Sequence, residues 1–273
     1  MTETETTETP TPTPDASGRS PKLGLLGCGC GAVVLGLMVL LLTFTFLAYR
    51  QSERLKAGYD SPEEAAAQVR KVLPYDELPE GYHPLGGASI PVLFRLAILT
   101  DLPPEERTGG EGAPRFRRTG FVYFSTFTLR SDDAALLRYF EEGPEPGQEE
   151  MEVELPDNSV AGDLGMDFTP REVIGRGREP VYGGAVYWVA RRGELVLQQD
   201  AFPGLATLFY LKCETGRRVR FGLWFGPEPT PGAGLETPEA DESNGNPIDY
   251  RGTPADPKAL QDFLGHFWIC GGS

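Results

Sequence analysis

Histidine is scarce in this chain, with two among 273 residues. His83 lies in a stretch rich in proline and glycine, and we expect it at the surface. His266 precedes Cys270 by four positions, so on a helix the two side chains would share one face. With Cys213 they have the residue types of a zinc site, but no fourth ligand is evident and paired C-x-x-C motifs are missing. We therefore predict no metal site.

Signatures of enzymes are also missing. No G-x-S-x-G nucleophile elbow is present. Seven acidic residues stand between positions 141 and 154, and two that met in space would suit a paired-carboxylate hydrolase, although such a run is more typical of a solvated surface. The stretch 241–249 hints at a calcium loop, but the glycine and glutamate of the EF-hand pattern are replaced by Asn246 and Gly252. No catalytic residue and no cofactor are predicted.

Cysteine is rare, and its four positions fall into two pairs. Cys28 and Cys30 lie in an apolar run, whereas Cys213 and Cys270 lie in the C-terminal part. In an oxidising compartment Cys213 and Cys270 would pair and join a strand to the last helix. Two separate thiols are an equally open interpretation.

Charge is absent from residues 23–49. As a helix, these 27 residues would be about 40 Å long, which is enough to cross the roughly 30 Å core of a bilayer. Residues 27–32 formally match the dinucleotide motif G-x-G-x-x-G/A, but the residues after them are apolar on every helix face and the first acid is Glu53. The run therefore predicts one transmembrane helix.

This helix is predicted to remain uncleaved. Residues 25–28 have the letters of a lipoprotein cleavage box, but the apolar run follows the box, whereas in a signal peptide it precedes it. Small residues within the helix would let two helices approach closely, or they reflect how common glycine is in membrane helices. These small residues are Gly27, Gly31, Ala32 and Gly36.

The net charge of −15 argues against binding to nucleic acid, because an acidic protein repels a phosphate backbone. The expected partners are the lipid bilayer and an envelope protein or a second copy. Three basic residues follow the apolar run and two precede it, which slightly favours a cytoplasmic C-terminus. A short tail before an early anchor is often retained inside, and the acidic domain with its two cysteines also favours export. We predict an inner-membrane protein with a cytoplasmic N-terminus and an extracytoplasmic domain.

The chain divides into a disordered tail of threonine, glutamate and proline (1–22), the transmembrane helix (23–49), a neck (50–60) and a domain (61–273). Ser61 and Asp256 are predicted to cap helices that begin with proline, and a third helix is expected near 134–142 after Ser131, Asp132 or Asp133. Residues 78–87 are predicted to form turns and residues 226–256 a long mobile loop. Strands are expected in 92–100 and 120–130 and in short runs farther on: EMEVELP, REVIGRG, GGAVYWVARRG, ELVLQQD, LATLFYLKC and RRVRFGLWF. This order predicts an α+β fold with a mostly antiparallel sheet packed by flanking helices.

Aromatic residues are expected mainly in the core. Phe121, Tyr123 and Phe127 alternate on one strand face. The last helix is expected to cover the sheet with one apolar face, formed by Leu260, Phe263, Leu264, Phe267 and Trp268.

Four segments carry a resemblance to known proteins: LPYDELPEGYHPLGG, REVIGRGREPVYGG, LWFGPEP and the closing helix PKALQDFLGHF. In this order they resemble an uncharacterised bacterial group of membrane-anchored envelope domains, and the closing sheet-then-helix order is similar to the PsbP/Mog1-like α+β sandwich. The resemblance covers residues 60–270 and implies no catalytic residues.

The sequence thus predicts a single-pass membrane protein that displays a non-enzymatic binding or assembly domain at the cell envelope. One alternative is a membrane-tethered hydrolase with paired carboxylates. Another is a module that binds lipid or a small ligand, which would need an apolar cavity of several hundred Å³ between sheet and helix.

Overall fold

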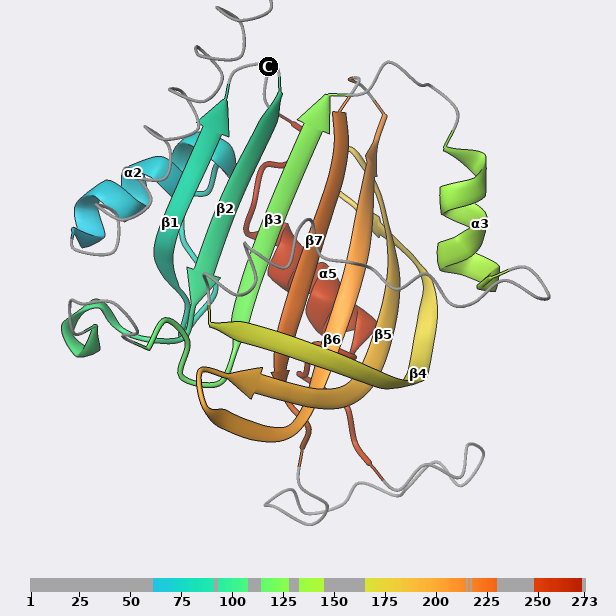
Figure 1. Cartoon of the computed structure of the whole chain (residues 1–273). Helices are drawn as coiled ribbons and strands as arrows, with labels where there is room; N and C mark the ends of the chain where they lie inside the picture. The colour runs from blue at the N-terminus through green and yellow to red at the C-terminus, as the bar shows by residue number, and fades with distance from the viewer. Residues whose placement is uncertain are drawn as a thin grey trace, which may run out of the picture. The chain divides into compact units, whose positions relative to one another are not determined.

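Seven antiparallel strands form one sheet in the order β1-β2-β3-β7-β6-β5-β4 (Figure 1). The computed structural model describes residues 61–90, 93–107, 114–127, 133–144, 165–214, 216, 218–229 and 248–271. The strands are β1 (His83–Ile90), β2 (Phe94–Thr100), β3 (Gly120–Phe127), β4 (Met166–Val181), β5 (Gly184–Leu197), β6 (Asp200–Cys213) and β7 (Arg218–Pro227). The helices are α2 (Pro62–Val72), α3 (Ala134–Glu142) and α5 (Pro257–Gly265), with one 3-10 turn, η1 (Pro104–Glu106). The predicted α+β fold with an antiparallel sheet is confirmed.

Several predicted segments lie outside the described residues. They are the tail, the transmembrane helix with Gly27, Gly31, Ala32 and Gly36, the neck, the strand near 150–156 and most of the loop 226–256. Within the described part of the chain, no helix is long and apolar enough to cross a membrane.

Two of the three predicted helix caps are confirmed. The Ser61 hydroxyl accepts a hydrogen bond from the Glu64 N–H at 3.4 Å, and the Asp256 carboxylate accepts one from the Lys258 N–H at 2.9 Å. Both satisfy amide groups that the first helical turn leaves without a partner.

Asp133 directly precedes α3 but does not cap it. Its carboxylate accepts hydrogen bonds from the Tyr210 hydroxyl at 2.9 Å and from the Lys212 ammonium at 3.1 Å, both on β6. The side chain therefore fastens the start of α3 to the sheet.

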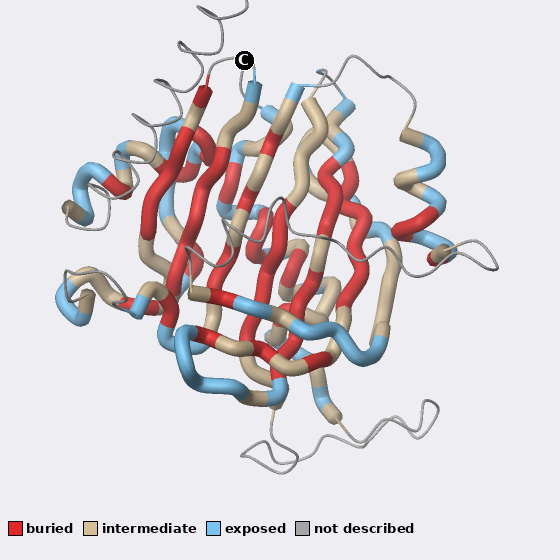
Figure 2. Tube along the Cα trace, viewed as in Figure 1, coloured by how far each residue is buried: buried red, intermediate tan, exposed pale blue. Residues whose placement is uncertain are grey.

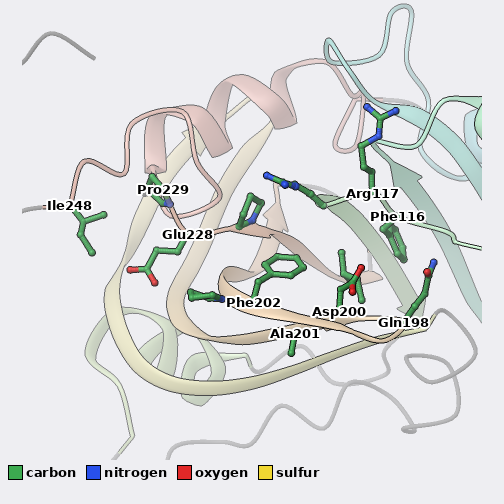
Figure 3. Close-up of a pocket in the computed structure, with 13 residues that line it drawn as sticks. Phe116, Arg117, Gln198, Asp200, Ala201, Phe202, Glu228, Pro229 and Ile248 are labelled. Carbon is green, nitrogen blue, oxygen red and sulfur yellow. The ribbon is translucent and has the colours of Figure 1, made fainter. Parts of the chain in front are cut away.

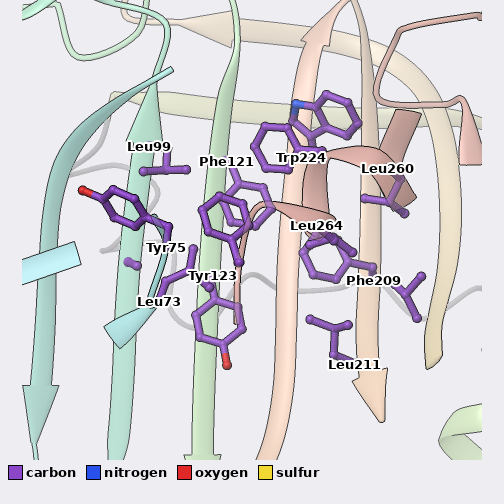
Figure 4. Close-up of a cluster of buried hydrophobic side chains, with 14 of the residues drawn as sticks. Leu73, Tyr75, Leu99, Phe121, Tyr123, Phe209, Leu211, Trp224, Leu260 and Leu264 are labelled. Atoms are coloured by element: carbon purple, nitrogen blue, oxygen red, sulfur yellow. The ribbon is translucent and has the colours of Figure 1, made fainter. Parts of the chain in front are cut away.

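Aromatic rings fill the space between α5 and the sheet (Figure 4). Phe121 is fully buried and stacks on Phe209 with ring centroids 5.7 Å apart. From α5, Phe263 lies 4.8 Å from the Phe121 ring and 4.7 Å from the Trp224 ring. The core role predicted for Phe121 and Phe263 is confirmed, but that for Phe127 is wrong, because this residue ends β3 beyond the helix and is exposed. The rings fill the layer between sheet and helix in which an apolar lipid cavity would have to lie.

The opposite face of the sheet is covered in two ways. The long hairpins of β4, β5 and β6 bend across it, helped by two irregularities in the β4–β5 register, and α3 covers the part near Tyr187 and Val189 (Figure 1). Met166 and Leu195 on the bent part pack in one cluster with Phe225 of β7. Consecutive residues are consequently buried in the middle of the central strands, at 204–207 in β6 and at 222–226 in β7 (Figure 2).

Two predicted strands, GGAVYWVARRG and ELVLQQD, are one continuous strand, β5. Gly193 between them does not mark a turn. A Cβ at this position would collide with the Thr169 carbonyl of β4, so glycine permits close contact between the two backbones within the sheet. Likewise, Gly175 and Gly177 of β4 leave room for the Trp188 ring.

The predicted turn over 78–87 is wrong in its second half. β1 begins at His83, which pairs with Thr100, so the proline and glycines after it lie in a strand. The side chain of His83 is half-buried and not freely exposed as expected.

The first prediction tests the packing of the aromatic rings between α5 and the sheet, which we call the ring layer. A Cβ at Gly222 would collide with the Phe209 ring, whereas a Cβ at Gly265, the last residue of α5, meets nothing within 4 Å. We expect Gly222→Ala to lower the free energy of unfolding by about 1–3 kcal/mol through overpacking. The control Gly265→Ala should raise it by up to about 1 kcal/mol, because alanine favours a helix. Denaturant unfolding of the full chain in mild detergent, followed by circular dichroism, measures both, and equal stability of the two variants would contradict the packing.

Candidate functional site

A disulfide bond joins Cys213, the last residue of β6, to Cys270 beyond α5, with their Cα atoms 5.3 Å apart. Of the two interpretations left open by the sequence, the structure has the bonded pair. The bond fastens the C-terminal segment to one end of the sheet. It also occupies both sulfur atoms, so neither is free to act as a thiolate ligand.

The face predicted for His266 and Cys270 does not exist, because α5 ends at Gly265. His266 is exposed just beyond the helix. In the described residues, no three His, Cys, Asp or Glu side chains are grouped so that they could hold a metal ion.

Trp268 was predicted to lie on the apolar face of this helix, and that prediction is wrong. Beyond Gly265 the helical period no longer applies. Phe267 packs inward against Phe121, and Trp268 is exposed.

A groove of about 700 Å³ lies at the end of the sheet where β5 and β7 end and β6 begins (Figure 3). We call this end the groove end. Phenylalanines and prolines form most of the apolar wall: Phe116, Phe202, Pro203, Pro227 and Pro229. Arg117, Arg118, Asp200 and Glu228 bring charges of both signs. The mixture suits a ligand that is partly apolar and partly charged.

Hydrogen bonds fix the walls of the groove. The Asp101 carboxylate accepts hydrogen bonds from the N–H groups of Arg117 and Arg118, both at 2.8 Å, and from that of Thr119 at 3.0 Å. On another wall, the Glu228 carboxylate accepts a bond from Arg192 at 3.3 Å. The groove is thus formed before any ligand binds, which lowers the entropy cost of binding.

The turn between β5 and β6 is strained where it lines the groove. Gln198 has a φ of 61° and is, within the described part of the chain, the sole non-glycine residue with positive φ. Its N–H donates a hydrogen bond to the Gly165 carbonyl at 2.6 Å, which holds it in place. Such strain is concentrated at functional sites.

The two acids that line the groove do not form a catalytic pair. Phe202 lies between Asp200 and Glu228, and their carboxylates do not point toward each other (Figure 3). Glu141 and Glu142, from the acidic run, are exposed on α3, and the remaining acids of that run lie outside the described residues.

Three arginines gather on the α5 face at the opposite end of the sheet. Arg95 and Arg220 both pair with Ser125, and Arg218 pairs with Phe127, the last residue of β3. Because side chains alternate along strands, all three arginines share the face of buried Tyr123. We call Arg95, Arg218 and Arg220 the arginine cluster and this end of the sheet the arginine end.

The arginine cluster has no acidic partner within salt-bridge distance among the described residues. Arg220 donates to the Arg218 carbonyl at 2.9 Å, and one buried guanidinium nitrogen of Arg218 has no hydrogen-bond partner in the described structure. Burial lowers the pKa of Arg218, and the positive charges of Arg95 and Arg220 lower it further. An anion would relieve this crowding.

Sequence reasoning found neither the groove nor the arginine cluster. The alternation in RRVRF does place Arg218 and Arg220 on one face, but nothing in the sequence brings Arg95 beside them. Comparisons with known protein families, with curated proteins and with solved structures found no match to this chain.

A prediction follows from the disulfide. Its two cysteines are 57 residues apart, and reducing the bond should lower the free energy of unfolding by about 3–4 kcal/mol, since the unfolded chain regains freedom. Denaturant unfolding with and without dithiothreitol measures this, and the Cys213→Ser/Cys270→Ser variant is the control that dithiothreitol should not affect. Identical unfolding of the wild type with and without reductant would contradict the stabilising role.

Proposed function

We propose that this chain is a single-pass membrane protein that displays a non-enzymatic binding domain outside the cytoplasm, and that the groove takes a segment of a partner protein. The observation that carries the proposal is the groove, with its volume of about 700 Å³, its apolar wall and its charges of both signs. The volume falls within the range of ligand sites.

The membrane part of the proposal rests on the uncharged run 23–49. The Cys213–Cys270 disulfide supports an oxidising compartment for the domain, because cytosolic thiols are kept reduced. The cytoplasmic N-terminus follows from these two features together.

A protein segment suits the groove better than a lipid does. A lipid tail needs an apolar, enclosed cavity, but Arg117 and Asp200 stand on this groove and rings fill the layer below α5. An extended segment would place an apolar side chain near Phe202 and its own charges near those of the wall. Hydrolysis by paired carboxylates is disfavoured because Asp200 and Glu228 do not converge (Figure 3).

The membrane and compartment assignments are tested on the Cys28→Ser/Cys30→Ser variant of the full chain, in which only Cys213 and Cys270 remain. After alkaline washing, we expect the chain to stay in the membrane pellet until detergent is added. A thiol reagent added to intact cells before lysis should label neither cysteine, and a second reagent should label both after reduction. Release without detergent, or labelling before reduction, would contradict the corresponding assignment.

The groove is tested by placing a photo-crosslinking residue at Ala201, which lines it, and at Glu141, which is exposed on α3. We expect a discrete cross-linked product from position 201 and none from 141. Adding Phe202→Ala should lower the yield at 201 by roughly tenfold, since the apolar contact is lost. The same products from both positions, or a yield that Phe202→Ala does not change, would show that the groove is not the binding site.

A further inference from the structure

The large hydrophobic side chains that are exposed in the described part of the chain lie beside the arginine cluster or near the disulfide at the end of β6. There are four, with these exposed fractions: Leu93 46%, Phe127 39%, Tyr182 77% and Trp268 51%. At the groove end, large apolar side chains are buried or partly covered. One end of the domain is therefore distinctly more apolar at its surface than the other.

The sheet register places the first two side chains together. Phe127 ends β3, and its N–H donates to the carbonyl of Leu93, the residue before β2, at 3.3 Å. Both lie beside the arginine cluster, since Phe127 is paired with Arg218.

The other two side chains reach the same end through different segments. Tyr182 stands in the turn between β4 and β5, and the next strand residue, Gly184, pairs with Cys213. Trp268 is two residues before Cys270, which the disulfide holds against Cys213.

The charge at this end differs from that of the whole chain. The chain carries a net charge of −15, yet the described acids near this end are few. Asp133 is paired with Lys212, Glu179 is partly buried near the end of β4, and Glu214 follows β6. Against these stand the three guanidinium groups of the arginine cluster, for which the described structure shows no acidic partner.

We propose that the arginine end docks on the surface of the bilayer, where the arginine cluster binds the phosphate groups of anionic lipids. Leu93, Phe127, Tyr182 and Trp268 enter the interfacial layer, which favours tryptophan and tyrosine in particular. Arginine suits this role because its fork matches phosphate oxygens and its charge persists at every physiological pH. This inference rests on the proposed membrane anchor.

The short neck favours the bilayer as the partner of the arginine end. Residues 50–60 separate the apolar run from α2, and 11 residues span at most about 40 Å. The domain therefore stays close to the membrane. Electrostatics favours this orientation, since anionic lipids attract the arginine end and repel the acidic remainder.

A second copy of the chain fits this end less well. A twofold dimer uses the same surface on both subunits, so the two arginine clusters would face each other across the interface. With no acidic partner at hand among the described residues, that contact would be repulsive.

Trp268 provides a direct measurement. Trp188 and Trp224 are buried, at 7% and 6% exposure, so a quencher in the lipid layer reaches mainly Trp268. The full chain is reconstituted into phosphatidylcholine vesicles with and without phosphatidylglycerol, each containing phospholipid brominated near the headgroup. We expect strong quenching in the anionic vesicles, weaker quenching in neutral ones, and little in the Trp268→Phe variant.

The charge requirement is tested with Arg95→Gln/Arg218→Gln/Arg220→Gln, whose quenching should fall at least about twofold. The control Arg171→Gln/Arg251→Gln/Lys258→Gln removes the same charge from exposed positions that belong neither to the groove nor to the arginine cluster, and it should quench like the wild type. Because Arg218 is partly buried, folding of both variants is checked by circular dichroism. In the unaltered protein, raising sodium chloride from about 0.05 M to about 0.5 M should also reduce quenching, since salt screens the attraction.

The possible failures are distinguishable. Equal quenching in the wild type and Trp268→Phe, or in the two triple variants when both fold, would overturn docking. A change of oligomeric state in the first triple variant without a change in quenching would assign this end to a second copy and would also overturn docking. If the chain inserts in the bilayer but shows no quenching, the docking of the arginine end is wrong and the proposed membrane anchor stands. If the chain does not insert at all, the proposed function is wrong as well.

Discussion

The contact of Phe263 with Trp224 and Phe121 is the interaction on which most of the domain depends. It seats α5, the last helix, on the middle of the sheet. Only a few residues follow α5, so its position brings Phe267 against Tyr75 and Cys270 against Cys213. The indole N–H of Trp224 also donates to the Tyr82 hydroxyl at 2.6 Å, just before β1. One ring layer thus joins the beginning, the middle and the end of the domain.

Local features were predictable because their causes are local. The helices α2 and α5 are marked by a capping side chain, a proline in the first turn and an apolar stripe, and these signals act within a few residues. Prediction failed where one residue type or spacing fits two different local structures. The sequence predicts two separate strands that meet at Gly193, but only the neighbouring strand shows that this glycine permits close backbone contact within one strand. Trp268 fits the helical period, but the period has no meaning beyond Gly265.

Neither the groove nor the arginine cluster could be predicted, since both are assembled by register. The groove takes Phe116 from a loop, Phe202 from β6 and Glu228 from the residue after β7. The arginine cluster needs β3 to lie between β2 and β7, and Ser125 to stand opposite both Arg95 and Arg220. A shift of one residue would turn these side chains to the other face. The disulfide could be predicted in part. The sequence identifies Cys213 and Cys270 as possible partners, but only the packing of α5 on the sheet brings them together.

An antiparallel sheet gives every strand one terminus at each end, so two chemically different surfaces can be separated by the whole length of the strands. Here the disulfide, the arginine cluster and the exposed apolar side chains fall at one end, and the strained turn and the groove fall at the other. If the arginine end rests on lipid, the groove points away from the membrane and is open to partners. The acidic character of the remaining surface then has a physical role, because repulsion from anionic lipid makes the inverted orientation unfavourable.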